Sequence, residues 1–329
     1  MNLKIGILSF EHMHSLSYAS ILNNLPDVEL TAAWDEDDER LDKYSKQFNI
    51  PISSHSIEEI LSLPLDGVII CSRNNTHLQL TEMAAKAGKH ILCEKPISTN
   101  REDGLKMIDI CKDCGVKLMI AFPCRYIPQM VRAKQIIEEG KLGEIFAVKT
   151  TNHGFLPGDW FIEPKLSGGG AVIDHTVHVM DLLRWMTGLE VTEVYAEIDR
   201  RIHDIPCEDL GLLSFKLGDK IFGTHDASWS RSQSYSIWGD VTMRFIGSEG
   251  ILEVDGFPQA LHIYDNNANK KHDTLSGGDN ADEEMIKDFI DAIKTDREPS
   301  ITGLDGLRAL EVALSAYKSA ELTQTVKNV

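Results

Sequence analysis

Short, continuous apolar runs alternate with helical stretches over the first 122 residues, and this alternation constrains the fold more than any other feature. The stretches at residues 16–25 and 78–87 carry apolar side chains at helical spacing. The apolar runs are continuous, as expected for strands that helices cover on both faces. They lie at residues 3–8, 30–34, 67–71, 90–93 and 117–122. The pattern predicts parallel βαβ units and hence a doubly wound parallel sheet.

The pattern of apolar residues changes near Pro123. One helical stretch spans residues 129–139, and the glycine-rich segment at residues 167–170 opens a second helix. From residue 191 onward apolar and polar side chains alternate, which is typical of antiparallel strands with one buried face. These strands are expected at residues 212–217, 220–229, 241–246, 250–254 and 260–264. The pattern predicts a second α/β unit with an open, mainly antiparallel sheet.

The 329 residues are enough for two domains, which we place at residues 1–122 and 123–329. Residues 265–280 are polar and glycine-rich, and this composition predicts a mobile loop. Helices are expected after this loop, at residues 283–294 and 304–322. These last helices are free to pack back on the first domain.

Charge and hydropathy exclude several classes of partner. Lys and Arg number 33 against 51 Asp and Glu, which gives a formal net charge of −18 without a basic cluster. Nucleic acids and anionic membranes are not expected as partners, because both bind through Lys and Arg. No apolar stretch reaches the roughly 18 residues of a membrane span, and the first apolar run is too short for a signal peptide. We expect a cytoplasmic protein.

The six cysteines fit reduced thiols better than a disulfide framework. Cys111 and Cys114 have a spacing that suggests redox or metal chemistry. This pair lies just before Gly115, where a helix is expected to end, and no second Cys or His pair stands nearby to complete a zinc site. We therefore expect these thiols to be inert.

The turn after the first strand lacks the glycines of a phosphate-binding loop. In a Rossmann fold the sequence G-x-G-x-x-G lets the backbone approach a pyrophosphate. The three glycine positions here hold Ser9, Glu11 and His14. The carboxylate of Glu11 would repel a pyrophosphate unless it turned away, although the N-terminus of the following helix still offers N–H donors. Taken alone, this turn argues against dinucleotide binding.

An acid at the end of the second strand argues in the opposite direction. Asp35 follows the apolar run at residues 30–34, where such folds place the carboxylate that binds the ribose hydroxyls. Residues 36–39 are also acidic, and Arg40 is the first cation after them. A 2′-phosphate would be repelled there, so NAD is favoured over NADP. A solvated acidic helix start explains residues 36–39 equally well, but it explains Asp35 less well.

His12 and His14 raise the question of a metal. Two histidines one residue apart can share a metal ion on an extended segment. No third ligand is identifiable from the sequence, so a role in the loop or in capping the helix is favoured and no metal is expected. A metal-dependent hydrolase built on this pair is disfavoured for the same reason.

Two further segments place reactive side chains at the ends of buried elements. Lys95 follows the strand at residues 90–93, and a lysine at such a strand end can stabilise a developing alkoxide. Asp174, His178 and Asp181 lie at i, i+4 and i+7, so they share one helical face. Burying three ionisable groups on an apolar helix is costly unless they act on something. This face and Lys95 together form a candidate active site.

These residues resemble the motifs of the Gfo/Idh/MocA family of NAD(P)-dependent oxidoreductases. The motifs are Glu94-Lys95-Pro96, Asn74-x-x-His77 and Gly168-Gly169-Gly170-x3-Asp174-x3-His178-x2-Asp181. Further matches in the same order are Arg125-Tyr126-x-Pro128, Lys134, Gly140-x-x-Gly143, the turn at residues 247–250, Glu298-Pro299 and Asp305-Gly306. The resemblance implies an N-terminal Rossmann dinucleotide-binding domain. It also implies a C-terminal substrate-binding domain whose open sheet makes homodimer or homotetramer contacts.

The resemblance also implies roles for individual residues. Lys95, Asp174 and His178 match the catalytic set of the family. The residues expected to bind the cofactor are Ser9, Phe10, His12, Asp35, Cys71, Ser72, Asn74, His77, Glu94, Lys95 and Arg125. Substrate contacts are expected from His153, Trp160, Lys165, Asp174 and His178, with Thr151 and Asp159 as further candidates.

Two functions are consistent with this sequence. The first is an NAD-dependent dehydrogenase that oxidises a secondary hydroxyl of a sugar, cyclitol or related polyol, or reduces the ketone. His178 would accept the hydroxyl proton while Lys95, oriented by Asp174, stabilises the oxygen. The second is a protein of the same fold that catalyses no reaction and acts as an NAD-responsive sensor or partner-binding protein. The glycine-free loop favours the sensor, and the complete set of Lys95, Asp174 and His178 favours the enzyme.

Overall fold

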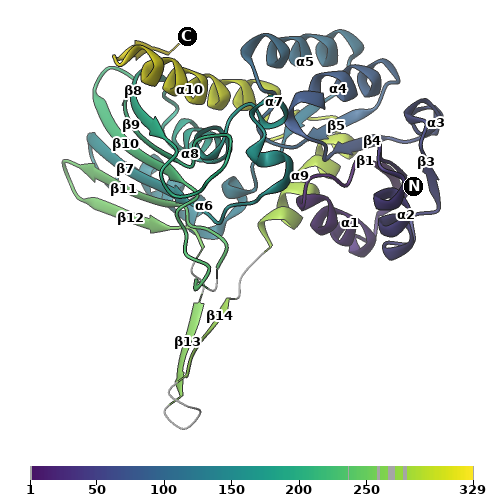
Figure 1. Ribbon diagram of the computed structural model, residues 1–329, viewed down its shortest axis with the longest axis horizontal. Coiled ribbons are helices and arrows are strands. Elements are labelled where there is room, and N and C mark those ends of the chain that lie inside the picture. Colours follow the sequence, from purple (N-terminus) through teal and green to yellow (C-terminus); the bar gives the residue numbers. More distant parts are fainter. Residues whose placement is uncertain (1, 236, 258–259, 266–270, 277–279, 329) are drawn as a thin grey trace.

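The N-terminal part of the computed structural model is a six-stranded parallel sheet flanked by helices (Figure 1). The structure describes residues 2–235, 237–257, 260–265, 271–276 and 280–328, with side chains in all of these except 260–265 and 271–276. The strands are β1 (Leu3–Leu8), β2 (Val28–Trp34), β3 (Ile52–Ser54), β4 (Gly67–Ile70), β5 (His90–Cys93) and β6 (Leu118–Ile120). Their order is β3-β2-β1-β4-β5-β6, with every neighbouring pair parallel. This is the Rossmann order, and it confirms the doubly wound sheet that the sequence predicted.

Five α-helices and one 3-10 helix connect these strands. They are α1 (His14–Asn24), α2 (Asp38–Gln47), α3 (Ile57–Ser62), η1 (Asn74–Thr76), α4 (His77–Lys86) and α5 (Arg101–Cys114). Local signals fix their ends. At the start of α5 the Asn100 side chain accepts the backbone N–H of Asp103, and at its end Gly115 adopts a left-handed conformation (φ 69°). The central strands are fully buried, as at Ile7 and Ile69. Two-sided burial is why these strands are continuous apolar runs in the sequence.

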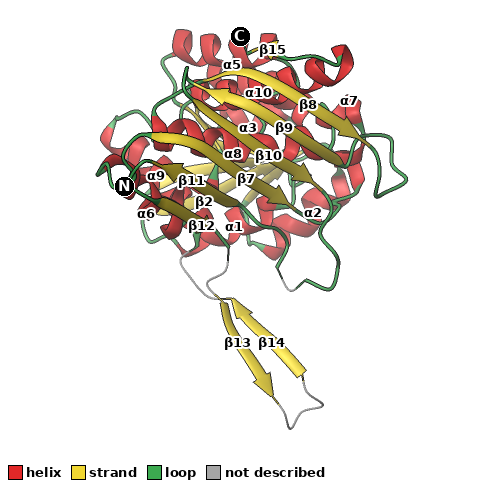
Figure 2. Cartoon of the chain, turned by 90° about the vertical axis from the view of Figure 1, so that its left-hand side faces the viewer, coloured by secondary structure: helices red, strands yellow, loops and turns green. Residues whose placement is uncertain are grey.

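The C-terminal part is built on a seven-stranded sheet with one open face (Figure 2). Its strands are β7 (Ile145–His153), β8 (Val191–Asp199), β9 (Leu210–Leu217), β10 (Ile221–Ser228), β11 (Thr242–Gly247), β12 (Ile251–Asp255) and β15 (Val326–Lys327). The order is β12-β11-β7-β10-β9-β8-β15, in which β7 and β10 are parallel and the other pairs are antiparallel. This confirms the prediction of an open, mainly antiparallel sheet.

Short helices and one long helix link the two sheets and cover one face of the second. These are the 3-10 helices η2 (Pro123–Tyr126) and η3 (Asp159–Ile162), with α6 (Pro128–Glu138), α7 (Pro164–Ser167) and α8 (Ala171–Thr187). Most of α8 is buried, from Ala171 to Leu183. The charged side chains of α8 therefore lie inside the protein, where they need partners.

A two-stranded antiparallel ribbon projects from the body of the molecule (Figures 1 and 2). It consists of β13 (Ala260–Asp265) and β14 (Lys271–Ser276). The prediction of a loop over residues 265–280 is wrong for 271–276, and its parts at 266–270 and 277–279 lie outside the described residues. Residues 271–276 are mostly polar and carry no apolar alternation, so nothing in the sequence marked β14 as a strand.

The last two helices return to the body of the molecule. They are α9 (Ala281–Thr295) and α10 (Gly303–Leu322). From α9, Phe289 and Ile293 lie close to the backbone of Gly67 in β4, so this helix packs on the first sheet. From α10, Leu307 approaches Gly104 of α5. Among the described residues, no helix is long and apolar enough to cross a membrane.

Candidate active site

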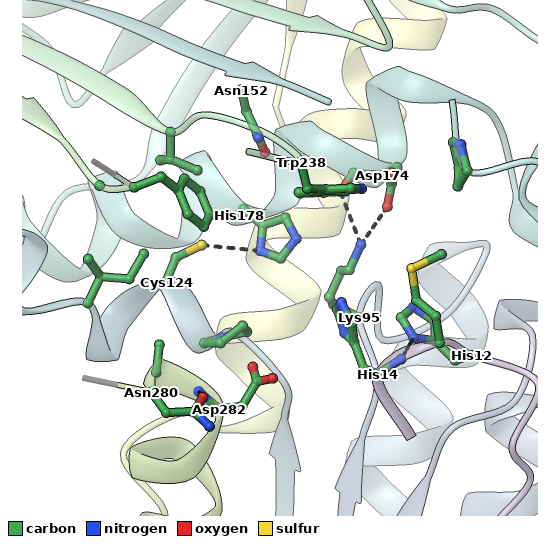
Figure 3. Close-up of a pocket in the computed structure, with 18 of the residues that line it drawn as sticks. His12, His14, Lys95, Cys124, Asn152, Asp174, His178, Trp238, Asn280 and Asp282 are labelled. Atoms are coloured by element: carbon green, nitrogen blue, oxygen red, sulfur yellow. Dashed lines mark hydrogen bonds and ion pairs between the residues drawn. The ribbon is translucent and has the colours of Figure 1, made fainter. Parts of the chain in front are cut away.

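A cavity of about 340 Å³ lies between the two halves of the chain (Figure 3). The β1–α1 loop contributes His12 and His14, and the end of β5 contributes Lys95. From the second half, α8 contributes Asp174 and His178. Other lining residues include Cys124, Asn152, Phe161, Trp238, Asn280 and Asp282. The cavity therefore brings together the lysine, the acid and the histidine that the sequence singled out.

Lys95 and Asp174 form a close ion pair at the wall of this cavity (Figure 3). The Lys95 Nζ lies 2.5 Å from Asp174 Oδ1 and 3.5 Å from the Asp174 carbonyl oxygen. The other oxygen, Oδ2, accepts a hydrogen bond from Trp229 Nε1 at 3.2 Å and lies 3.3 Å from His175 Nε2. Burial alone would raise the pKa of Asp174, but the Lys95 ammonium holds it well below its usual range. Asp174 is thus an anion that fixes the position of Lys95.

His178 follows Asp174 by one helical turn and also lines the cavity. Its ring is buried, and burial beside the Lys95 charge lowers its pKa well below the usual range. Its Nδ1 lies 3.9 Å from the Cys124 sulfur, and Phe122 makes an edge-on ring contact. Burial raises the pKa of Cys124 to about 12, so this neighbour is a neutral thiol. A neutral imidazole in this position can accept a proton from a ligand in the cavity.

The third ionisable residue of this helical face, Asp181, lies outside the cavity. Asp181 is bound by Arg125, with Nε at 2.7 Å from Oδ2 and Nη2 at 2.5 Å from Oδ1. Arg125 also donates to the Ser300 carbonyl at 2.9 Å and lies 3.1 Å from Asp305 Oδ1. The sequence assigned Arg125 to the cofactor, but its guanidinium is buried and engaged by this network. Arg125 and Asp181 therefore connect η2, α8 and α10 instead of lining the cavity.

The β1–α1 loop uses its own backbone donors internally. Ser9 adopts a positive φ of 75°, a conformation that glycine favours, so the first glycine position keeps its backbone shape without glycine. The N–H of Phe10 donates to Asp35 at 2.6 Å, and that of Glu11 donates to Ser9 Oγ at 3.1 Å. The His12 N–H donates to the Cys71 carbonyl at 2.8 Å. These three amides are not free to bind a phosphate.

Asp35 is fully buried, and both of its oxygens are occupied. Arg40 binds it in a bidentate manner, with distances of 2.6 and 2.9 Å, and the N–H groups of Phe10 and Asp37 add further bonds. The expectation that Asp35 binds ribose hydroxyls is at odds with this geometry. The next residue, Glu36, lines a separate pocket together with Ser9, Glu11, Ser72 and Arg73.

Two family models match most of the chain. Residues 4–122 match the oxidoreductase family with an NAD-binding Rossmann fold, and residues 130–253 match the GFO/IDH/MocA C-terminal domain. Inositol 2-dehydrogenase of Rhizobium meliloti is 30% identical over 78% of this chain and 78% of that protein. The chain belongs to the Gfo/Idh/MocA oxidoreductase family.

Other members of the family resemble this chain over its whole length. Myo-inositol 2-dehydrogenase of Thermotoga maritima is 27% identical over 99% of this chain and 98% of that protein. The solved structure of an aldose-aldose oxidoreductase from Caulobacter crescentus, complexed with glycerol, has a TM-score of 0.84. It is 27% identical and covers 99% of this chain and 100% of that chain.

The remaining residues that the Gfo/Idh/MocA resemblance assigned to the cofactor have varied surroundings. Ser72 lines the Glu36 pocket, whereas Phe10 packs on Tyr44. His77 is buried, and its ring nitrogens lie 3.0 Å from the Pro96 carbonyl and 3.2 Å from the Ser72 carbonyl. Asn74 donates to the Ser167 carbonyl at 2.8 Å, which joins the two halves of the chain. Contacts of His77 and Asn74 thus hold the walls of the site in place.

The residues from which substrate contacts were expected in this Gfo/Idh/MocA chain lie partly inside and partly outside the cavity. Asp174 and His178 line the cavity, but Lys165 is exposed outside it. Trp160 is buried, stacks on Phe161 and donates to the Glu11 carbonyl at 3.4 Å. Asp159 is exposed, and Thr151 hydrogen-bonds to Asp240 and Thr242.

The neighbours of the expected residues line the cavity instead. Asn152 does so in place of His153, because successive side chains of a strand point to opposite faces and the sequence did not fix the register. Phe161 takes the place of Trp160. Asp282, which accepts a hydrogen bond from Ser17 at 2.8 Å, had no local signal because it reaches the cavity from the start of α9.

His153 lies between two carboxylates on the other side of β7. Its Nδ1 is 2.7 Å from Asp240 and its Nε2 is 3.2 Å from Asp226. Burial opposes protonation, but hydrogen bonds to Asp226 and Asp240 raise the pKa of His153 to about 9. The ion pairs therefore stabilise the fold fully below pH ~6.5, the pKa of a free histidine, and are lost as the pH rises through about 9.

We expect His153→Gln to flatten the fall in melting temperature between pH 6.5 and 9.5. Thermal unfolding of the wild type and the variant across this range measures the effect. His55→Gln is the matched control, since His55 is more exposed and pairs with the exposed Asp38. Equal slopes in the wild type and His153→Gln would contradict this role.

Proposed function

We propose that this protein is an NAD-dependent dehydrogenase that oxidises a secondary hydroxyl of a sugar, cyclitol or related polyol, or reduces the corresponding ketone. One observation carries the proposal: Lys95, fixed by the Asp174 carboxylate at 2.5 Å, shares a cavity with the neutral His178. Relatives named as inositol dehydrogenases support the substrate class. In this proposal residues 1–122 bind the nucleotide and residues 123–329 bind the substrate.

In this proposal each of the three side chains has one task. His178 accepts the proton of the substrate hydroxyl, and Lys95 donates a hydrogen bond to the same oxygen and stabilises its negative charge. Asp174 holds Lys95 in place through the 2.5 Å contact. Bound NAD would accept the hydride from the carbon atom that bears this hydroxyl.

Two pockets near the carboxyl ends of the strands of the first sheet could hold the two nucleosides of a dinucleotide. Ser9, Glu36, Ser72 and Arg73 line a pocket beside the carboxyl ends of β1, β2 and β4, where an adenosine binds in Rossmann folds. The larger cavity beside Lys95 would take the nicotinamide.

Glu36 is the acid best placed to select NAD over NADP. Asp35 is occupied by Arg40, whereas Glu36 is half exposed, lines the pocket and forms an ion pair with Arg73. A 2′-phosphate at this position would meet the Glu36 carboxylate.

We expect Glu36→Ser to raise kcat/KM for NADP relative to NAD by roughly tenfold, which corresponds to ~1.4 kcal/mol. The variant removes the repelling charge and releases Arg73 to bind a phosphate. Steady-state kinetics with both cofactors measures the ratio, and Glu39→Ser, in the exposed first turn of α2, is the matched control. If Glu36→Ser leaves the ratio of kcat/KM for NADP to that for NAD unchanged, Glu36 does not select the cofactor.

A catalytically silent, NAD-responsive sensor is the second candidate. The observation in its favour is the β1–α1 loop, whose amides at residues 10–12 are engaged within the protein. A sensor would bind the cofactor without turning over any polyol.

Fluorescence titration with NAD⁺ and NADH, followed by an absorbance assay for NADH over a panel of inositols, aldoses and sugar alcohols, separates the two functions. Turnover of a panel member establishes the dehydrogenase. Binding without turnover across the panel favours the sensor, and no binding of either cofactor form contradicts both.

The open face of the second sheet supports a homodimer or homotetramer. Phe222 is 65% exposed, and Leu212, Ile251 and Phe146 are also exposed on this sheet. Apolar side chains grouped on one open face are typical of a covered surface. Light scattering coupled to gel filtration should give a mass of two or four chains, and Phe222→Lys should lower it.

A cytoplasmic location is also proposed. All six cysteines are free, and five of them are buried. Cys111 and Cys114 form no disulfide, although only two residues separate them. Reduced thiols of this kind are typical of a reducing compartment.

A further inference from the structure

Three side chains with metal-binding atoms converge beside the active-site cavity. His12 and His14 come from the β1–α1 loop, and Glu94 comes from the end of β5 (Figure 3 shows the two histidines). Their potential ligand atoms all lie within 4.8 Å of one another. His14 Nδ1 is 3.0 Å from Glu94 Oε1, and His12 Nε2 is 3.8 Å from Glu94 Oε2. The fold thus supplies the third ligand that the His12-x-His14 sequence lacked.

One nitrogen of this cluster is buried without a partner. His12 is 1% exposed, and its Nε2 makes no hydrogen bond in the structure. Buried polar atoms are nearly always paired, so an orphaned imidazole nitrogen directed at a carboxylate points to a missing ligand. Both histidines also line the cavity that Lys95 and His178 share.

We propose that His12, His14 and Glu94 bind a divalent transition metal ion of the zinc type, with an open coordination position toward the cavity. Two imidazoles and one carboxylate are a zinc ligand set that leaves room for a further ligand. Atoms ~2 Å from one ion lie roughly 3–3.5 Å apart, and the observed separations need only small side-chain adjustments to reach this range.

The surrounding residues hold the carboxylate as a metal site requires. The Tyr18 hydroxyl donates to Glu94 Oε1 at 2.6 Å, and the Lys95 backbone N–H donates to Oε2 at 3.2 Å. Such outer contacts orient a ligand. One contact opposes binding: the His14 N–H donates to His12 Nδ1 at 3.2 Å, and this nitrogen must carry the proton when Nε2 binds the ion. A single long hydrogen bond is lost while three metal–ligand bonds form.

A cation at this position would also replace the positive charge that the backbone N–H groups of the β1–α1 loop no longer offer. Because the N–H groups of residues 10–12 are bound within the protein, they offer little positive charge to an anionic or hydroxyl oxygen in the cavity. A bound Zn²⁺ would supply that charge and accept such an oxygen in its open position.

The test is Zn²⁺ binding by the full chain without a histidine tag, after dialysis against a chelator. We expect titration calorimetry and elemental analysis to give about one Zn²⁺ per chain, and Zn²⁺ to raise the melting temperature. His12→Ala and His14→Ala should each weaken binding about 100-fold or more. His55→Ala, an exposed histidine paired with Asp38, is the matched control and should bind as the wild type does.

Near-ultraviolet circular dichroism identifies any variant that fails to fold, and the partly exposed His14 offers the milder change in His14→Asn. Failure of the wild type to bind Zn²⁺ at micromolar concentrations overturns the proposal. Binding of equal strength in wild type, His12→Ala and His14→Asn also overturns it. Neither readout depends on turnover, so the result is independent of the proposed dehydrogenase activity.

Discussion

Replacing His178 with alanine is expected to lower kcat by about 10²–10⁴-fold while the KM for NAD changes little. The imidazole is buried in the cavity, and burial beside Lys95 lowers its pKa well below the usual range, so it stays neutral at working pH. It is the side chain best placed to accept the hydroxyl proton, because Lys95 is held by Asp174 as a donor. Without this imidazole the hydroxyl proton must be transferred to water, and this transfer is much slower than transfer to a positioned base.

The measurement is steady-state kinetics on whichever polyol the wild type oxidises, followed through NADH absorbance. Added imidazole should restore part of the lost rate in His178→Ala, which a purely structural defect would not show. His203→Ala is the matched control, since that ring contacts the Trp229 carbonyl outside the cavity. A kcat within threefold of the wild type would remove His178 from the proton-transfer step.

The sequence predicted both sheets because their signals are local. Continuous apolar runs marked β1, β2, β4, β5 and β6, and period-two alternation marked β9, β10, β11 and β12 of the second sheet. The strands β7, β8 and β15 of that sheet were not among the predicted strands. Short β3 was missed, since its three residues are exposed or half buried and carry no apolar run. The strand β14 was missed because residues 271–276 are mostly polar and carry no period-two pattern.

The difference between residues with and without a local sequence signal also explains which parts of the site could be predicted. Lys95, Asp174 and His178 could be predicted as a candidate site because a strand end and one helical turn place them by rule. Asp35 and Arg125 were given ligand roles because nothing local revealed their protein partners, Arg40 across a turn and Asp181 on a distant helix. Spacing alone cannot show whether a charge is already neutralised by another residue.

His12 and His14 illustrate a second limit of local signals. The spacing of the pair was visible, but a metal site needs a third ligand, and Glu94 is brought to it only by the pairing of β4 with β1 and β5. Such a ligand set is a property of the assembled sheet.

Removing one partner of the buried Arg125–Asp181 pair is expected to cause the largest loss of stability. Arg125 is 5% exposed and Asp181 is 1% exposed, and two hydrogen bonds of 2.5 and 2.7 Å join them. Asp181→Ala leaves the buried guanidinium with Asp305 at 3.1 Å, the Ser300 carbonyl and the Trp185 ring as partners. Removing one partner of a buried ion pair costs about 3–5 kcal/mol of unfolding free energy when the other charge is left uncompensated, and the remaining Asp305 contact places the expected cost near the lower end of this range.

Urea unfolding followed by tryptophan fluorescence measures this cost, with Glu82→Ala as the control. Glu82 pairs with Lys86 on the surface of α4, so its loss should change the free energy of unfolding by about 0.5 kcal/mol or less. The double variant Asp181→Leu/Arg125→Met should recover much of the loss, because it buries no unpaired charge. A cost below about 1 kcal/mol for Asp181→Ala would mean that water reaches the pair. In that case the network could not hold η2 and α8 in the positions that bring His178 to Lys95.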